Sequence, residues 1–170
     1  RIERLHETLA ELELDASERE VDTPEVWTVA SEGPLDARLA ETITGANEEV
    51  ALVLRSADGW TAEIENAIDM VVGRGVSAHV VTTPSETIDL SDLDGVDSSQ
   101  ADLSWLESSG DDGRIDRLVL VDGDRLVLTT TPDDSDGGER GIVAEGRSNG
   151  AVVLCRRLIS DAMPERQVVE

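Results

Sequence analysis

The sequence predicts one α/β domain with a mixed sheet and flanking helices, preceded by a coiled-coil helix. Two observations predict the domain: short Val, Leu and Ile runs alternate with helical segments, and an Asp-Gly pair joins two apolar runs. At 170 residues and 39% hydrophobic, the chain can build one core. We expect a dimerisation helix over 1–15, a linker over 16–24, the α/β domain over 25–164 and a tail over 165–170.

The dimerisation helix is predicted from its heptad spacing. Ile2, Leu5, Leu9 and Leu12 follow one another at intervals of three, four and three residues, which is the spacing of a coiled-coil seam. We expect a homodimer through this seam. The alternative is an amphipathic helix that folds back on its own domain. The periodic segment is already under way at Arg1, so we expect further chain upstream.

The first half of the domain alternates between strands and helices. A continuous apolar run, Val50 to Leu54, is typical of a strand that is buried on both faces at the centre of a sheet. The strand after it is expected to pair in parallel through a helical crossover. The expected elements are a strand over 25–30, a helix over 33–47, a strand over 50–54, a helix over 60–73 and a strand over 76–82.

The second half opens with an irregular segment over 83–112, in which we expect at most one short helix near 101–107. Two apolar runs, 117–121 and 125–130, flank Asp122 and Gly123, which predicts a tight hairpin. A polar loop over 131–141, a strand over 142–144 and a helix that Ser148 or Asn149 caps complete the prediction. Pro164 is expected to end this helix.

The composition is strongly acidic and free of lysine. There are 38 acidic residues against 14 basic ones, all arginine, for a formal net charge of −24. Such self-repulsion is screened at molar salt, where the Debye length is about 3 Å. We therefore expect a haloarchaeal, cytoplasmic protein that loses stability on dialysis to low salt, and equal melting temperatures at high and low salt would contradict this. No apolar run approaches a membrane span.

Abundant carboxylates make any acidic pair uninformative about catalysis. His79 and His6 have no Cys or His at ligand spacing, so we expect no metal and no cofactor. We expect Cys155 to be a buried, inert thiol, since free Cys is among the most buried residue types. The alternative is a redox-responsive thiol whose pKa is lowered by the charge of the adjacent Arg156 and Arg157.

Two segments are candidates for binding a small effector. Arg147, Ser148 and Asn149 lead into a helix N-terminus, where backbone N–H groups hold anions such as a sugar phosphate. The alternative is a capped helix start without a ligand. Trp60 follows a strand-to-helix connection, and its indole face suits a sugar ring as well as a core.

The order of elements resembles one half of the phospholipase D-like fold. Active members carry His-x-Lys, four further residues and Asp, with the His as nucleophile. Aligning that Asp on Asp122 places Arg117 at the lysine position and Ile115 at the histidine position. Isoleucine is no nucleophile, so the resemblance implies a catalytically degenerate domain and no enzyme. We count Arg117 and Asp122 among the expected ligand-binding residues.

A degenerate domain of this kind behind a heptad helix resembles the C-terminal part of archaeal TrmB-like transcriptional regulators. The resemblance is carried by EVWTVASEGPLDARLAETITGANEEVALVL, RGVSAHVV, RLVLVDGDRLVLTTT and EGRSNGAVVLCRRLI. It implies dimerisation, the sensing of a sugar or sugar phosphate, and an upstream winged-helix domain. DNA contact is expected only through that domain, because the scattered arginines form no basic patch. The alternatives are a phosphodiesterase-like enzyme with another site and a purely structural dimerisation module.

Overall fold

The computed structural model describes residues 26–30, 32–106, 113–132 and 138–163. The expected heptad helix, linker and tail lie outside these ranges, as does Pro164. The strands are β1 (Val26–Ala30), β2 (Glu49–Leu54), β3 (Ser77–Thr82), β4 (Val96–Gln100), β5 (Arg114–Val121), β6 (Arg125–Thr131) and β7 (Arg140–Glu145). The helices are α2 (Glu32–Thr44), α3 (Ala62–Gly73) and α4 (Gly150–Ala162), with short 3₁₀ turns η1 (Ala57–Gly59) and η2 (Ser104–Leu106).

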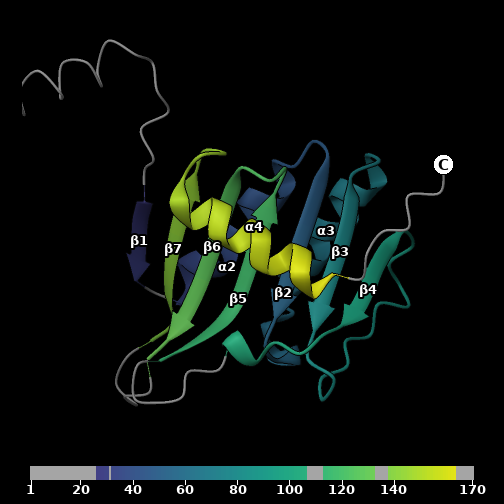
Figure 1. Cartoon of the computed structure of the whole chain (residues 1–170). Coiled ribbons are helices and arrows are strands. Elements are labelled where there is room, and N and C mark those ends of the chain that lie inside the picture. Colours follow the sequence, from purple (N-terminus) through teal and green to yellow (C-terminus); the bar gives the residue numbers. More distant parts are fainter. Residues whose placement is uncertain (1–25, 31, 107–112, 133–137, 164–170) are drawn as a thin grey trace, which may run out of the picture.

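Within the described residues, seven strands form one mixed sheet in the order β1-β7-β6-β5-β2-β3-β4. β2, β3 and β4 run parallel to their neighbours in this group, whereas the other pairs are antiparallel. Helix α4 crosses one face, and α2 and α3 cover the other (Figure 1). The predicted mixed α/β sheet is confirmed, and β2 lies inside it between β5 and β3 as expected.

Each face of the sheet has its own core. The larger core, between the sheet and α2 and α3, includes Leu39, Ile64 and Val119. The second lies under α4 and η2. Close packing at β7 depends on a glycine, because a Cβ on Gly141 would lie 2.2 Å from the Leu35 side chain of α2. α2 can therefore rest directly on the backbone of β7.

The predicted hairpin is confirmed. β5 and β6 are joined through Asp122 and Gly123, whose φ angles of 53° and 66° are both positive. This is the geometry of a turn whose twist matches that of its strands, and Asp and Gly tolerate it. Asn149 caps α4 through its side chain, which accepts from the N–H of Ala151 at 3.0 Å, so the expected helix start is also confirmed.

The irregular segment expected over 83–112 is wrong in one respect. Residues 96–100 (VDSSQ) form β4, which pairs in parallel with β3 at the edge of the sheet. The strand lacks the apolar runs that identified the others, because its side chains are largely exposed and β3 supplies its backbone hydrogen bonds. None of the helices within the described residues is long and apolar enough to cross a membrane.

Candidate functional site

A polar cavity of about 500 Å³ opens at the end of the sheet where β2 finishes. Ligands in α/β proteins are commonly bound beyond the carboxyl ends of parallel strands. Six elements or their flanking residues contribute: α2, β2 with the turn after it, the residue before α3, β5, β6 and the residue before β7. We call this the β2-end pocket, and its lining consists of Asp36, Arg55, Ser56, Asp58, Gly59, Thr61, Asp116, Arg117, Thr131 and Glu139.

Arg117 on β5 is the buried cation of this pocket. Its side chain is 4% exposed and donates to Glu139 through Nε at 3.0 Å and Nη2 at 2.7 Å. Nη1 donates to a carboxylate oxygen of Asp36 on α2. Burial alone would lower the pKa of the guanidinium, but the two carboxylates outweigh it and raise that pKa above its ordinary value. Arg117 therefore stays charged and joins three parts of the chain.

A second ion pair lies beside it. Arg55 follows β2 directly and donates to Asp116 through Nε at 3.0 Å and Nη2 at 2.7 Å. The hydroxyl of Thr131 donates to the other carboxylate oxygen of Asp116. Asp116 thus has both oxygens occupied, and the ends of β2, β5 and β6 are held together at the rim of the pocket.

The turn η1 forms one wall of the pocket and packs on Arg117. A Cβ on Gly59 would lie 3.1 Å from Cγ of Arg117, so glycine allows the turn to lie against the arginine stem. The carboxylate of Glu86, in the segment after β3, accepts from the N–H of Ala57 at 2.7 Å and so fixes the position of the turn. Glu86 also lines a smaller neighbouring cavity of about 290 Å³.

The structure brings only part of the expected effector site together. Arg117 lines the β2-end pocket. Trp60 lies next to it in sequence, but its indole packs against the larger core and donates to Glu65 at 3.0 Å. The remaining expected residues lie at the opposite ends of β5 and β7: Asp122, Arg147, Ser148 and Asn149. The expected residues therefore do not form one site.

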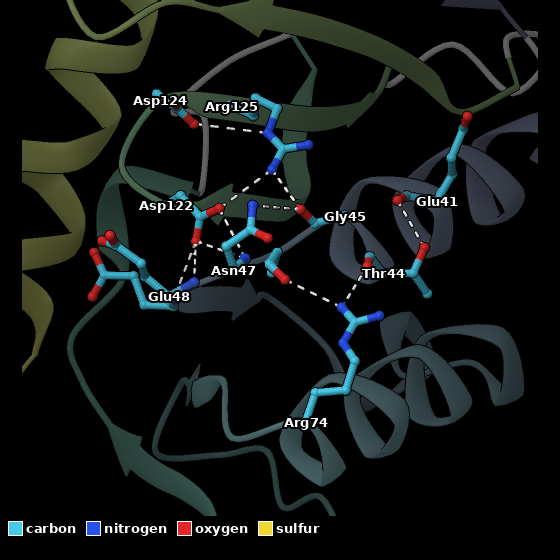
Figure 2. A network of polar contacts seen from close by, with 11 residues as sticks. Glu41, Thr44, Gly45, Asn47, Glu48, Arg74, Asp122, Asp124 and Arg125 are labelled. Carbon is cyan, nitrogen blue, oxygen red and sulfur yellow. Dashed lines mark hydrogen bonds and ion pairs between the residues drawn. The ribbon is translucent and has the colours of Figure 1, made fainter.

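The carboxylate of Asp122 is bonded to backbone N–H groups. It accepts from the N–H groups of Asn47, Glu48 and Glu49 at 2.8 to 3.2 Å, and Arg125 lies 3.3 Å away (Figure 2). Burial would raise the pKa of this carboxyl, but the three N–H donors and Arg125 together hold it below its ordinary value. Asp122 ties the hairpin to the start of β2.

The predicted anion site before α4 is also engaged in structural contacts. The side chain of Asn149 caps the helix and donates to the carbonyl of Glu145 at 3.2 Å. The carbonyl of Arg147 accepts from Arg156 at 3.2 Å. Arg147 and Ser148 are exposed. These contacts are those of a helix start and its neighbours. Arg147, Ser148 and Asn149 line neither of the two cavities described above.

Cys155 is buried, as the sequence favours, and the lowered pKa of the redox-responsive alternative is contradicted. The thiol is buried at 7% exposure on the inner face of α4, and burial raises its pKa. Arg156 is turned toward the carbonyls of Gly123 and Arg147 instead. A buried thiol with a raised pKa forms little thiolate, which is the reactive form.

The sequence analysis did not identify most residues of the β2-end pocket as ligand-binding residues. Asp36, Asp116 and Glu139 are three among 38 acidic residues, so composition hid them. Arg55 carried a usable signal, because it directly follows the central apolar strand and so lies at the carboxyl edge of the sheet. Within the described residues, no group of three or more His, Cys, Asp or Glu is arranged to hold a metal ion.

We expect Asp122→Asn to lower the free energy of unfolding by about 2 kcal/mol, because three backbone N–H groups lose a charged acceptor. Asn tolerates positive φ, so the turn itself is preserved. The folded pKa lies below the ordinary value of 3.8. The stabilisation is therefore fully present above pH 3.8 and lost as the pH falls through the lower folded pKa.

Urea denaturation of the wild type and the variant over a pH series measures this contribution. Asp94→Asn is the control, because Asp94 is exposed and forms no hydrogen bond or ion pair with the described residues. A stability difference between wild type and Asp122→Asn that stays constant on acidification would contradict the account.

Solved structures with a phospholipase D-like fold are similar to this chain. NucT from Helicobacter pylori matches with a TM-score of 0.55 at 15% identity, over 81% of this chain and 96% of that one. Nuc from Salmonella typhimurium, a phospholipase D family member, matches with a TM-score of 0.56 at 13% identity, over 82% and 93%. These likenesses confirm the predicted phospholipase D-like fold.

A third similar structure is TrmBL2, described as an archaeal chromatin protein with a novel mode of DNA binding. The TM-score is 0.52 at 15% identity, and the match covers 94% of this chain and 60% of TrmBL2. This chain therefore corresponds to a part of that protein. No protein-family model and no curated protein matches the sequence.

The prediction that the chain is not an enzyme is wrong. It depended on Ile115 standing where active members have a nucleophile. The finding that overturns it is that the similar structures include Nuc, a phospholipase D family member, and NucT. The comparisons place the chain in a fold that enzymes and a chromatin protein share, and their low sequence identities show the fold alone.

Proposed function

We propose that this chain is the effector-sensing and dimerisation part of a TrmB-like transcriptional regulator, with the effector bound in the β2-end pocket. The single observation that carries the proposal is the geometry around Arg117. A cavity large enough for a small organic molecule is lined by residues from both halves of the sheet and from α2. A molecule bound there contacts groups that hold separate elements together.

The pocket is suited to sensing because its walls are joined through paired charges. Asp36 belongs to the first turns of α2, and Glu139 precedes β7. A ligand that competes for either carboxylate changes how Arg117 connects these two segments. A difference in contacts between the free and bound states is what an effector needs in order to shift a conformational equilibrium.

Dimerisation is proposed through the heptad residues, which lie outside the described part of the chain. The support is the spacing of Ile2, Leu5, Leu9 and Leu12. A monomeric chain in analytical ultracentrifugation at micromolar concentration would contradict dimerisation.

DNA contact is proposed to belong to a separate domain, because a chain with a net charge of −24 repels phosphates. TrmBL2, the similar chromatin protein, supports a DNA-related setting.

The pocket assignment is tested with a pair of variants on α3. Thr61 lines the pocket, and its side chain makes no capping hydrogen bond, so Thr61→Phe fills the cavity at little cost to the helix. Ala62 is exposed and outside the pocket lining, which makes Ala62→Phe the matched control. We expect a thermal-shift panel of sugars, sugar phosphates, amino acids and organic amines to contain a stabilising ligand.

The stabilising ligand should raise the melting temperature of the wild type and of Ala62→Phe by several degrees, and leave Thr61→Phe unshifted. A panel without any stabilising compound would contradict the proposal. A ligand whose shift survives Thr61→Phe would show that the effector binds elsewhere.

Catalysis in the same pocket is a second candidate function. The observation that favours it is the likeness to a phospholipase D family member, combined with a buried arginine, Arg117, at the lysine position of the family's His-x-Lys pattern. The test is hydrolysis of bis(p-nitrophenyl) phosphate. Activity that Ala62→Phe retains and Thr61→Phe abolishes would support catalysis in the pocket. Hydrolysis that both variants retain would place the activity outside the pocket.

A further inference from the structure

The charge of the β2-end pocket is unfavourable for anions. Four carboxylates and two guanidinium groups line it, which gives a formal charge of −2 in a chain of formal charge −24. An anionic ligand would have to enter a negative potential that the rest of the protein reinforces. The pocket thus differs from sites that bind phosphate, in which cations are in excess.

Both arginines of the pocket are already paired with carboxylates of the protein. Every nitrogen type of Arg117 already donates to a carboxylate, either of Glu139 or of Asp36. Arg55 donates twice to Asp116. A phosphate could bind Arg117 only by displacing a carboxylate that the protein itself supplies, and at Arg55 it would reach only Nη1, beside the carboxylate of Asp116. The fixed cations of the site are therefore already neutralised.

The groups left over in the pocket are hydrogen-bond acceptors. The exposed carboxylate of Asp58 makes no hydrogen bond or ion pair with the described residues, and only one of the two carboxylate oxygens of Asp36 is bonded to a side chain in that part of the chain. The buried Oγ1 atom of Thr61 also has no partner among the described residues. A ligand that carries N–H donors would therefore find two carboxylates and one hydroxyl as acceptors.

A bare metal ion does not suit this arrangement. The cavity measures about 500 Å³, which is the size of a small organic molecule. Within the described residues, no three acidic, His or Cys side chains are grouped for metal binding. The surplus negative charge instead suits an organic cation, because an ammonium or guanidinium group supplies several N–H donors together with its charge.

We infer that the ligand of the β2-end pocket is a small organic cation, whose ammonium or guanidinium group binds Asp58 and the free oxygen of Asp36. This inference rests on the proposed function and narrows it. It disfavours the sugar phosphate expected from the sequence, since a phosphate would meet the unpaired carboxylate of Asp58 and the second oxygen of Asp36. The rest of the ligand lies along the paired arginines and the hydroxyls of Ser56 and Thr131.

The test compares three compounds that share a five-carbon skeleton and differ in charge: pentanediamine, pentanediol and glutarate. Isothermal titration calorimetry at one fixed salt concentration measures each dissociation constant with the wild type. We expect pentanediamine to bind and the other two not to bind. Thr61→Phe should abolish this binding, and Ala62→Phe should leave it unchanged.

Asp58→Asn removes one surplus charge at an exposed position, so the fold is retained. It should weaken pentanediamine binding about threefold to tenfold. Asp94→Asn removes the same charge at a distance and should have no effect. Equal affinities of wild type, Asp58→Asn and Asp94→Asn would indicate a general attraction to the acidic surface and would overturn the inference.

The outcomes separate this inference from the proposed function. Binding of pentanediol or glutarate that Thr61→Phe blocks would overturn the cation assignment and leave the pocket as a ligand site. Absence of binding by all three overturns the inference if a neutral or anionic compound of the wider panel binds in the pocket. If no compound of the panel binds, both the cation inference and the proposed function are contradicted.

Discussion

The buried guanidinium of Arg117 is the constraint on which one end of this fold depends. Removing a charge from water costs several kcal/mol unless the charge is paired and hydrogen-bonded. Arg117 meets this requirement with Asp36 from α2 and Glu139 from the residues before β7. The helix, the central hairpin and the edge of the β7 strand must therefore be placed together for the arginine to be buried. The walls of the β2-end pocket follow from that placement.

The opposite end of the sheet is fixed by a carboxylate instead. Asp122 opens the β5–β6 turn and accepts three backbone N–H groups at the start of β2. Around it, Arg125 reaches the carbonyl of Gly45, and Arg74 reaches the carbonyls of Thr44 and Ala46 (Figure 2). The side chains near the β5–β6 turn form hydrogen bonds with backbone groups, whereas those at the start of β5 line a cavity. One end of β5 therefore stabilises the fold, and the other contributes to the pocket.

The sequence predicted elements whose identity depends on local patterns. The apolar run at β2 and the Asp-Gly turn gave a central strand and a hairpin, since both patterns have direct structural causes. Strand β4 was missed because its residues are polar and only its neighbour makes it a strand. The site was largely missed, because Asp36, Asp116 and Glu139 become distinctive only when folding places them beside arginines. The sequence left Trp60 open between a ligand platform and a core residue, and its indole packs against the larger core.

The most direct test of the central claim is a double-mutant cycle between Arg117 and Glu139, measured by urea denaturation at neutral pH. Arg117→Met leaves two carboxylates without their cation and should lower the free energy of unfolding by about 3 kcal/mol. Adding Glu139→Gln should cost less in this background than in the wild type, with a coupling energy of at least about 1 kcal/mol. Additive effects of the two substitutions would contradict the account, because the arginine would then not depend on its partner.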